Sequence, residues 1–174
     1  GKSEDEVPIT IDIVDQENEY REWMSFADMD LNCAKYLYKA PMNPRPLNAI
    51  CLHCQQAAEK ALKAIIVYYG SCGGMAKKHE IPFLFNQIKN LVYNDKRIRV
   101  TDELKDMGAT LTKYAVDLRY PNEITIEEHD VAKAISDSKA IVVWAKEVLM
   151  TPSVRKEESC TDLSNKVADN GADD

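Results

Sequence analysis

The stretch NAICLHCQQAAEKALKAIIVYYG, residues 48–70, decides the fold of this chain. Its apolar and small residues recur every three or four positions, which is the period of an α-helix with one buried face. Gly70 is a residue type that commonly follows a helix end. We therefore expect a long helix from about Leu47 to Tyr69. Its expected buried face consists of Ile50, Cys51, Cys54, Ala57, Ala58, Ala61, Leu62, Ile65 and Ile66.

The same helical period covers most of the chain and predicts five helices joined by short connections. Pro82 fits only the first turn of the third helix, and Thr101 is a suitable N-cap for the fourth. Thr125 and Glu128 have the spacing of a capping box that starts the fifth. This pattern predicts an all-α bundle. The expected helices are Glu17 to Lys39, Leu47 to Tyr69, a shorter one within 79–94, Asp102 to Arg119, and one that ends near Leu149.

The first and fifth helices also have predicted buried faces. Asp30 is unusual on such a face, because a buried carboxylate needs a cationic or hydrogen-bonding partner to offset its desolvation. Lys60 and Arg119 are the candidates for that partner. The predicted faces are Trp23, Phe26, Ala27, Asp30, Ala34 and Leu37 in the first helix, and Ala132, Ile135, Ser138, Val142, Ala145 and Leu149 in the fifth.

The two ends of the chain differ in composition from the middle. Residues 1–16 are expected to form an N-terminal arm, in which the alternation of Ile9, Ile11 and Ile13 with polar residues favours a short strand. Residues 17–150 form the expected helical bundle. Residues 151–174 are acidic and contain few large apolar residues, so we expect a flexible tail.

Length and charge limit the classes of function. A chain of 174 residues is long enough for one ordinary domain. Its net charge of −7 argues against a constitutive, basic type of binder of nucleic acid or of an anionic membrane, and leaves a local basic patch open; no binding to double-stranded DNA is expected. No apolar run has the length of a membrane span, and the N-terminus lacks the pattern of a signal peptide. We therefore expect a cytoplasmic protein.

The tetrapeptide CLHC, residues 51–54, has three readings: half of a metal site, a redox pair, or the start of a buried helix. A structural zinc site needs a second pair of ligands at close spacing, and the sequence has none. A thioredoxin-like pair needs a βαβ context, which is also lacking. Cys51 and Cys54 continue the apolar face of the second helix, so we predict buried thiols with no metal and no cofactor.

Two polar groups are candidates for binding. His53, Gln56, Lys60 and Lys63 recur at three- and four-residue steps on the second helix, away from its apolar face. This line is either a solvent-facing surface or a surface for a ligand or a partner. His79 follows two lysines just before a predicted helix start, where free N–H groups favour an anion. The alternative for His79 is a local cap in a solvated loop.

Four short motifs in order resemble the HEPN domain family, named for nucleotide binding in higher eukaryotes and prokaryotes. The resemblance covers about Glu17 to Leu149. It implies an up-and-down bundle of four long helices plus one shorter helix, and a homodimer. It also implies association with a minimal nucleotidyltransferase, in the manner of a toxin–antitoxin pair. The motifs are ADMDLNCA at 27–34, CLHCQQAAEKALKAIIV at 51–67, KHEIPFL at 78–84 and YAVDLRYPNE at 114–123.

The resemblance also implies site residues. Some family members are metal-independent ribonucleases with an Arg-x(4–6)-His motif, in which histidine is the acid or base and arginine stabilises charge. Here Arg119 and His129 are separated by nine residues, which departs from that motif. The positions that match the family motifs are Asp30, Gln56, Glu59, Lys60, His79, Arg119 and Tyr120.

Three functions remain open at this point. The first is a non-catalytic homodimeric module that binds a nucleotide, an RNA or a partner nucleotidyltransferase. The second is a ribonuclease toxin of the same fold that uses Arg119 and His129. The third is a helical scaffold with no small ligand. The Arg–His spacing favours a protein that is not an enzyme.

Overall fold

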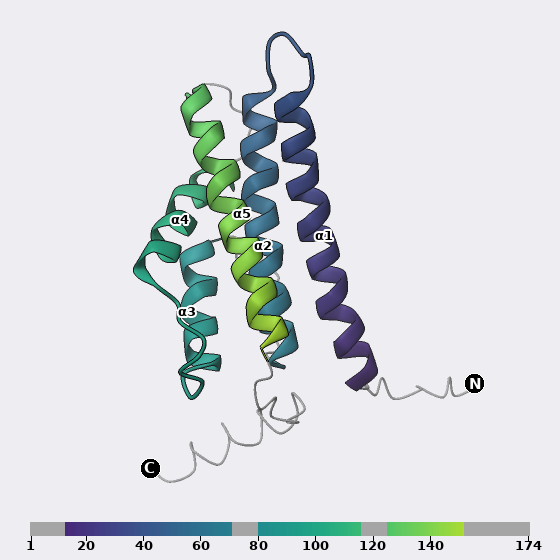
Figure 1. Ribbon diagram of the computed structural model, residues 1–174, viewed down its shortest axis with the longest axis vertical. Coiled ribbons are helices and arrows are strands. Elements are labelled where there is room, and N and C mark those ends of the chain that lie inside the picture. Colours follow the sequence, from purple (N-terminus) through teal and green to yellow (C-terminus); the bar gives the residue numbers. More distant parts are fainter. Residues whose placement is uncertain (1–12, 71–79, 116–124, 152–174) are drawn as a thin grey trace, which may run out of the picture.

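The computed structural model describes residues 13–70, 80–115 and 125–151, with side chains from Asn18 onward. Every regular element in these ranges is a helix, which confirms the all-α prediction (Figure 1). Three helices are long and two have 11 residues. The elements are α1 (Ile13–Lys39), α2 (Leu47–Tyr68), α3 (Ile81–Leu91), α4 (Asp102–Thr112), the 3-10 turn η1 (Lys113–Ala115) and α5 (Glu128–Met150).

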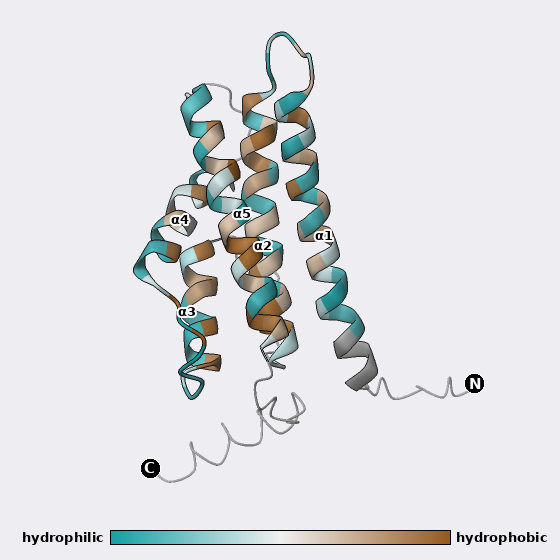
Figure 2. Ribbon diagram, in the orientation of Figure 1, coloured by the Kyte–Doolittle hydropathy of each residue, from teal (hydrophilic) through white to brown (hydrophobic). Residues whose placement is uncertain are grey.

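Helix α2 lies at the centre of the bundle and contacts all the other helices. Its ribbon is largely apolar (Figure 2), and residues 61–67 are buried on every side. In the described part of the chain, α1 packs only on α2 and α5. The shorter helices α3 and α4 contact each other and α2, and α4 also contacts α5. An apolar central helix therefore organises the bundle; the helix itself and its buried face were predicted from residues 48–70, but its central position was not.

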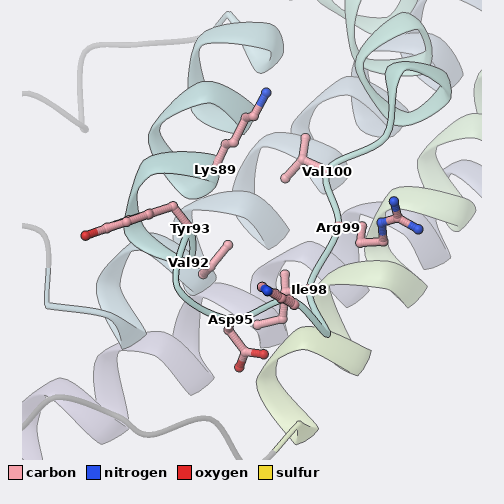
Figure 3. Close-up of a pocket in the computed structure, with 8 residues that line it drawn as sticks. Lys89, Val92, Tyr93, Asp95, Ile98, Arg99 and Val100 are labelled. Carbon is pink, nitrogen blue, oxygen red and sulfur yellow. The ribbon is translucent and has the colours of Figure 1, made fainter.

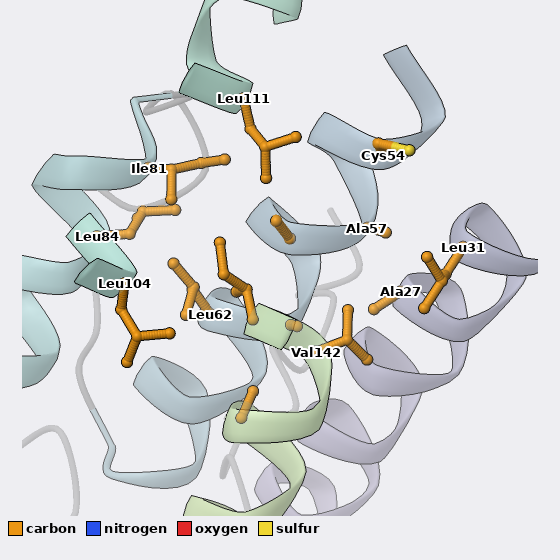
Figure 4. Close-up of a cluster of buried hydrophobic side chains, with 14 of the residues drawn as sticks. Ala27, Leu31, Cys54, Ala57, Leu62, Ile81, Leu84, Leu104, Leu111 and Val142 are labelled. Atoms are coloured by element: carbon orange, nitrogen blue, oxygen red, sulfur yellow. The ribbon is translucent and has the colours of Figure 1, made fainter. Parts of the chain in front are cut away.

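The hydrophobic core takes side chains from all five helices (Figure 4). Leu62, Ile81, Leu111 and Val142 are fully buried there. Gly108 permits the close approach of α4 to α3, because a Cβ at this position would lie 2.6 Å from Ile81 Cγ2. The α3–α4 pair and the connection between them are thus held tightly against the rest of the bundle.

Two helix boundaries differ from the prediction. Helix α1 begins at Ile13, so this residue is helical and does not belong to the strand expected in the arm; residues 1–12 lie outside the described part. Helix α4 ends at Thr112 and continues as η1, whereas the predicted helix ran to Arg119. The Thr112 hydroxyl donates to the Gly108 carbonyl at 2.8 Å and accepts from the Ile81 N–H at 3.1 Å. Such side-chain bonds to the backbone compete with regular helix geometry.

The start and the buried face of α5 also need correction. The capping box is formed by Glu127 and Asp130, and not by Thr125 and Glu128. The Asp130 carboxylate accepts from the Glu127 N–H at 2.9 Å. Ser138, Val142 and Ala145 are buried as predicted, but Ala132 is exposed and Ile135 and Leu149 are half-buried. Because α5 packs on both α2 and α4, its buried sector is wider and also includes Val131, Ala134, Ile141 and Val148.

Candidate functional site

Asp30 is the centre of a polar cluster between α1 and α2. Its carboxylate accepts a hydrogen bond from Lys60 Nζ at 2.6 Å. His53 Nδ1 lies 2.9 Å from the other carboxylate oxygen. Because a carboxylate only accepts, Nδ1 carries a proton and donates it. The predicted pairing of Asp30 with Lys60 is confirmed, and His53 is a second partner that the sequence did not reveal.

The burial of this cluster is uneven. The Asp30 side chain is 11% exposed, whereas those of Lys60 and His53 are 26% and 33% exposed. A carboxylate taken out of water needs such partners, and here each of its two oxygens accepts from one donor. Lys60 and His53 therefore both donate to Asp30, and they are not left unpaired for an anionic ligand.

A second polar chain runs along the buried side of α2. Gln55 donates to Glu59 at 3.1 Å, and Lys63 Nζ donates to the same carboxylate at 3.3 Å. These side chains repeat every four residues, so they stack on one side of the helix. Lys63 also lies over the Trp23 ring, 5.5 Å from its centroid. Lys63 is only 3% exposed, so its predicted place on a solvent-facing line was wrong.

The two thiols of CLHC are fully buried in the core, as predicted. Burial raises the pKa of Cys51 to about 11 and that of Cys54 to about 12. The thiolate is the form that binds metals and attacks disulfides, so these groups are inert at neutral pH. Among the described residues, no three His, Cys, Asp or Glu side chains gather so as to hold a metal ion.

A row of apolar side chains is exposed on α1, among polar ones. Phe26 is 45% exposed, Met29 58% and Tyr36 78%, and the Cys33 thiol is also exposed. Phe26 was predicted to be buried, but α1 has helices on one side only, and Leu31 takes the buried place instead. We call Phe26, Met29, Cys33 and Tyr36 the α1 face.

A hollow of about 450 Å³ adjoins the start of the α1 face. Trp23 and Phe26 supply its apolar lining, and Lys60 lies over the Phe26 ring at 5.8 Å. Glu19 and Glu22 also line the hollow. Two carboxylates beside a lysine already paired with Asp30 make this hollow unfavourable for a phosphate group.

Comparison with known proteins assigns the chain to a family. The HEPN domain matches residues 20–148, which is most of the chain. This chain belongs to the HEPN domain family. A comparison with curated proteins gives no match.

Two solved structures share the HEPN fold of this chain. TT1696 from Thermus thermophilus superposes with a TM-score of 0.55 and 24% sequence identity, over 75% of this chain and 98% of that chain. ST0689, an archaeal HEPN homologue, superposes with a TM-score of 0.53 and 21% identity, over 75% of this chain and 97% of that chain. At these identities the likeness establishes the fold.

The structure places the predicted HEPN motif residues in different environments. Asp30 and Lys60 form one cluster, and Glu59 belongs to the separate buried chain. Gln56 is half-buried and has no hydrogen bond to the described residues. His79, Arg119 and Tyr120 lie outside the described residues. Of the predicted line His53, Gln56 and Lys60, two residues therefore pair with α1: His53 and Lys60 both contact Asp30.

His129, the predicted catalytic alternative, lies at the start of α5 and is 75% exposed. Its two ring nitrogens lie 3.3 Å from carboxylate oxygens of Glu127 and Asp130. Arg45 donates to the Tyr38 carbonyl and lies 3.4 Å from Glu128. Carboxylates around a histidine oppose the approach of a phosphodiester, because like charges repel.

Sequence reasoning did not find three of the features above: His53 as a partner of Asp30, the buried Gln55–Glu59–Lys63 chain, and the α1 face. The four-residue spacing of Gln55, Glu59 and Lys63 was a usable signal for the chain. The spacing of Phe26, Met29, Cys33 and Tyr36 was also visible, but it overlaps the stripe that packs on α2.

Proposed function

We propose that this HEPN chain is a non-catalytic binding module that works as a homodimer, and that the α1 face is the dimer interface. The observation that supports it most directly is the exposed α1 face itself. Large apolar side chains that lie together on one surface mark sites of protein interaction. In the described part of the chain, no helix covers this side of α1.

The spacing of the α1 face suits a second copy of the same helix. Positions 26, 29, 33 and 36 follow the three- and four-residue steps of a helix–helix seam. A two-fold dimer brings the same patch of both subunits together. With the axis near the middle of the face, Phe26 of one copy lies opposite Tyr36 of the other.

Charges at the ends of the α1 face favour the same arrangement. The N-terminal end has Glu19 and Glu22 with Arg21 between them, a small acidic excess, and the C-terminal end has Lys39. Two antiparallel copies would set each acidic end beside a basic end. Complementary charges at the rim of an interface favour one register over others.

A protein partner is supported better than a nucleotide at the groove between α1 and α2. Lys60 and His53 are bound to Asp30, and Lys63 is bound to Glu59. A nucleotidyltransferase, in the toxin–antitoxin type of association, is the other protein that could dock on the α1 face. We commit to the second copy, because the seam spacing and end charges are self-complementary.

Light scattering after size exclusion tests the dimer. The wild type should give twice the chain mass of 19.7 kDa at micromolar concentration. Phe26→Glu and Tyr36→Glu should each raise the dimer dissociation constant at least tenfold, since each places a charge in an apolar interface. Tyr93→Glu, an exposed aromatic on another helix end, is the matched control and should remain dimeric. A monomeric wild type would exclude the second copy and leave co-expression with a nucleotidyltransferase as the next test.

Cross-linking can locate the interface. In a Cys72→Ser/Cys160→Ser variant, Cys33 is the remaining exposed thiol, because Cys51 and Cys54 are buried. A short bis-maleimide should then give a covalent dimer, and adding Cys33→Ser should abolish it. A dimer by mass that fails to cross-link through Cys33 would place the interface elsewhere.

The non-catalytic part of the proposal has its own test. Total RNA incubated with purified protein in EDTA should remain intact. Specific cleavage that is lost in Arg119→Ala or His129→Ala would contradict the proposal and establish the ribonuclease alternative.

A further inference from the structure

The connection between α3 and α4 concentrates positive charge on an acidic protein. Residues 89–100 contain Lys89, Lys96, Arg97 and Arg99 against a single acid, Asp95, whereas the whole chain has a net charge of −7. Acidic residues resume at Asp102. Most of the acidic excess of the chain lies in residues 1–12 and 152–174, so residues 89–100 are a basic segment within a middle part whose charges nearly balance.

Asp95 fixes the shape of this connection. Its carboxylate accepts from the Arg97 N–H at 3.1 Å and from two guanidinium nitrogens of Arg97 at 2.9 and 2.8 Å. These hydrogen bonds hold the pKa of Asp95 below its usual range. Val92 and Ile98 are buried beneath it. The connection therefore has a defined conformation, and Arg97 neutralises Asp95, the single acidic residue in 89–100.

The other three cations have no such partner. Lys89, Lys96 and Arg99 are exposed, and none of them forms an ion pair with the described residues. They line a shallow hollow of about 450 Å³ together with Val92, Val100 and Tyr93. Figure 3 shows Lys89 and Arg99 on either side of Val100. The Tyr93 side chain extends from the end of α3 in the direction away from Arg99.

Tyr93 adds an aromatic ring to this basic surface. It is 76% exposed, although a tyrosine ring is apolar enough to favour burial. Asn90 and Asn94, on either side of it in the sequence, are also exposed. An exposed ring on a surface that also has cations and amides offers stacking, phosphate contacts and hydrogen bonds. We call Lys89, Tyr93, Lys96 and Arg99 the 89–100 surface.

We propose that the 89–100 surface binds single-stranded nucleic acid. Lys89, Lys96 and Arg99 would contact successive phosphates, and one base would stack on Tyr93. This combination of a basic track with an exposed aromatic is how proteins hold single strands with little sequence preference. The surface shares no residue with the α1 face, so this inference does not depend on the proposed dimer.

The spread of the groups selects an extended ligand. In Figure 3 the side chains of Lys89, Tyr93 and Arg99 point in different directions, so contact with all three suits a strand that continues past the ring. A duplex would hide the face of each base, which Tyr93 needs for stacking, and the acidic remainder of the chain would repel its many phosphates.

Fluorescence anisotropy with labelled 12-residue oligo(U) and oligo(dT) tests the inference at about 50 mM salt. Lys96→Gln/Arg99→Gln should weaken binding at least tenfold. It should also make the slope of log affinity against log salt shallower by about 1.4, since each phosphate contact on a single strand contributes roughly 0.7. Lys113→Gln/Lys139→Gln removes the same charge from exposed positions on η1 and α5 and should leave the slope unchanged.

Tyr93→Leu separates base stacking from charge. It should weaken binding of the oligonucleotides roughly tenfold, because stacking of one base contributes about 1–3 kcal/mol. It should leave binding of inorganic polyphosphate, which has no bases, unchanged. Phe26→Glu, which targets the α1 face, should not alter affinity for either oligonucleotide.

Three results would overturn the inference. The first is no binding of either oligonucleotide at 50 mM salt and at protein concentrations up to roughly 100 μM, the weak end of the range of typical non-specific dissociation constants. The second is an equal loss in the Lys113→Gln/Lys139→Gln control, which would indicate bulk charge. The third is tighter binding of a poly-Glu peptide with loss in the same variants, which would assign the surface to an acidic protein segment.

Discussion

The charged residues of α2 and those of the 89–100 surface have opposite environments. On α2, Lys60 and Lys63 each lie within 3.3 Å of a carboxylate that is largely buried. At the α3–α4 connection, Lys89, Lys96 and Arg99 are exposed and have no ion pair in the described part of the chain. The lysines of α2 that pair with buried carboxylates stabilise the bundle, whereas the exposed cations in the last turn of α3 and in the connection after it remain available to a ligand.

This comparison predicts its largest effect at Glu59. Glu59→Gln leaves Lys63 with a buried charge and no ionic partner, so we expect a loss of about 3 kcal/mol in the free energy of unfolding. Urea denaturation measures it. Adding Lys63→Met should restore most of the loss, because it removes the uncompensated charge. A loss below about 1 kcal/mol would show that the pair is well solvated and would weaken the comparison.

The buried thiols of α2 predict a dependence on pH. Burial raises the pKa of Cys51 to about 11 and of Cys54 to about 12, from the usual 9.0. Above pH 9 the unfolded chain loses these protons first, so the free energy of unfolding falls as pH rises toward 11. Between pH 8 and pH 10 the wild type should lose about 2 kcal/mol more than Cys51→Ala/Cys54→Ala. Equal losses would mean that water reaches the thiols.

A smaller loss in the free energy of unfolding is expected at Asp30, whose partners are partly exposed. Asp30→Asn removes the charge that pairs with Lys60 and His53, which remain partly exposed and can be solvated. We expect a loss of about 1–2 kcal/mol in urea denaturation. Gln56→Ala, on the same helix as Lys60 and without a hydrogen bond to the described residues, should change stability by less than about 0.5 kcal/mol. Equal losses in the two variants would show that the Asp30 cluster adds no specific stability.

The smallest effect on stability is expected at the 89–100 surface. Lys96→Gln/Arg99→Gln should change the free energy of unfolding by less than about 0.5 kcal/mol, because exposed charges without partners contribute little. The thermal unfolding midpoint checks this. A clear loss would indicate that these cations stabilise the connection, which would remove the contrast with α2.

The sequence by itself determined the fold class and most of the core. The helical period of residues 48–70 correctly predicted α2 and its buried thiols, because a regular period needs no knowledge of distant residues. The same period indicated that Asp30 lies on a packed face, and burial of a carboxylate implied a cationic partner. Lys60 was one of the two partners considered.

The tertiary structure decided which side of each amphipathic helix is covered and which charges are paired. Phe26 and Lys63 were assigned to the wrong environments because a helix period defines a stripe but not how many helices pack around it. His53 contacts Asp30 across two helices, which spacing along one helix does not predict. Exposure depends on neighbours that are distant in sequence, and only the packed bundle brings them together.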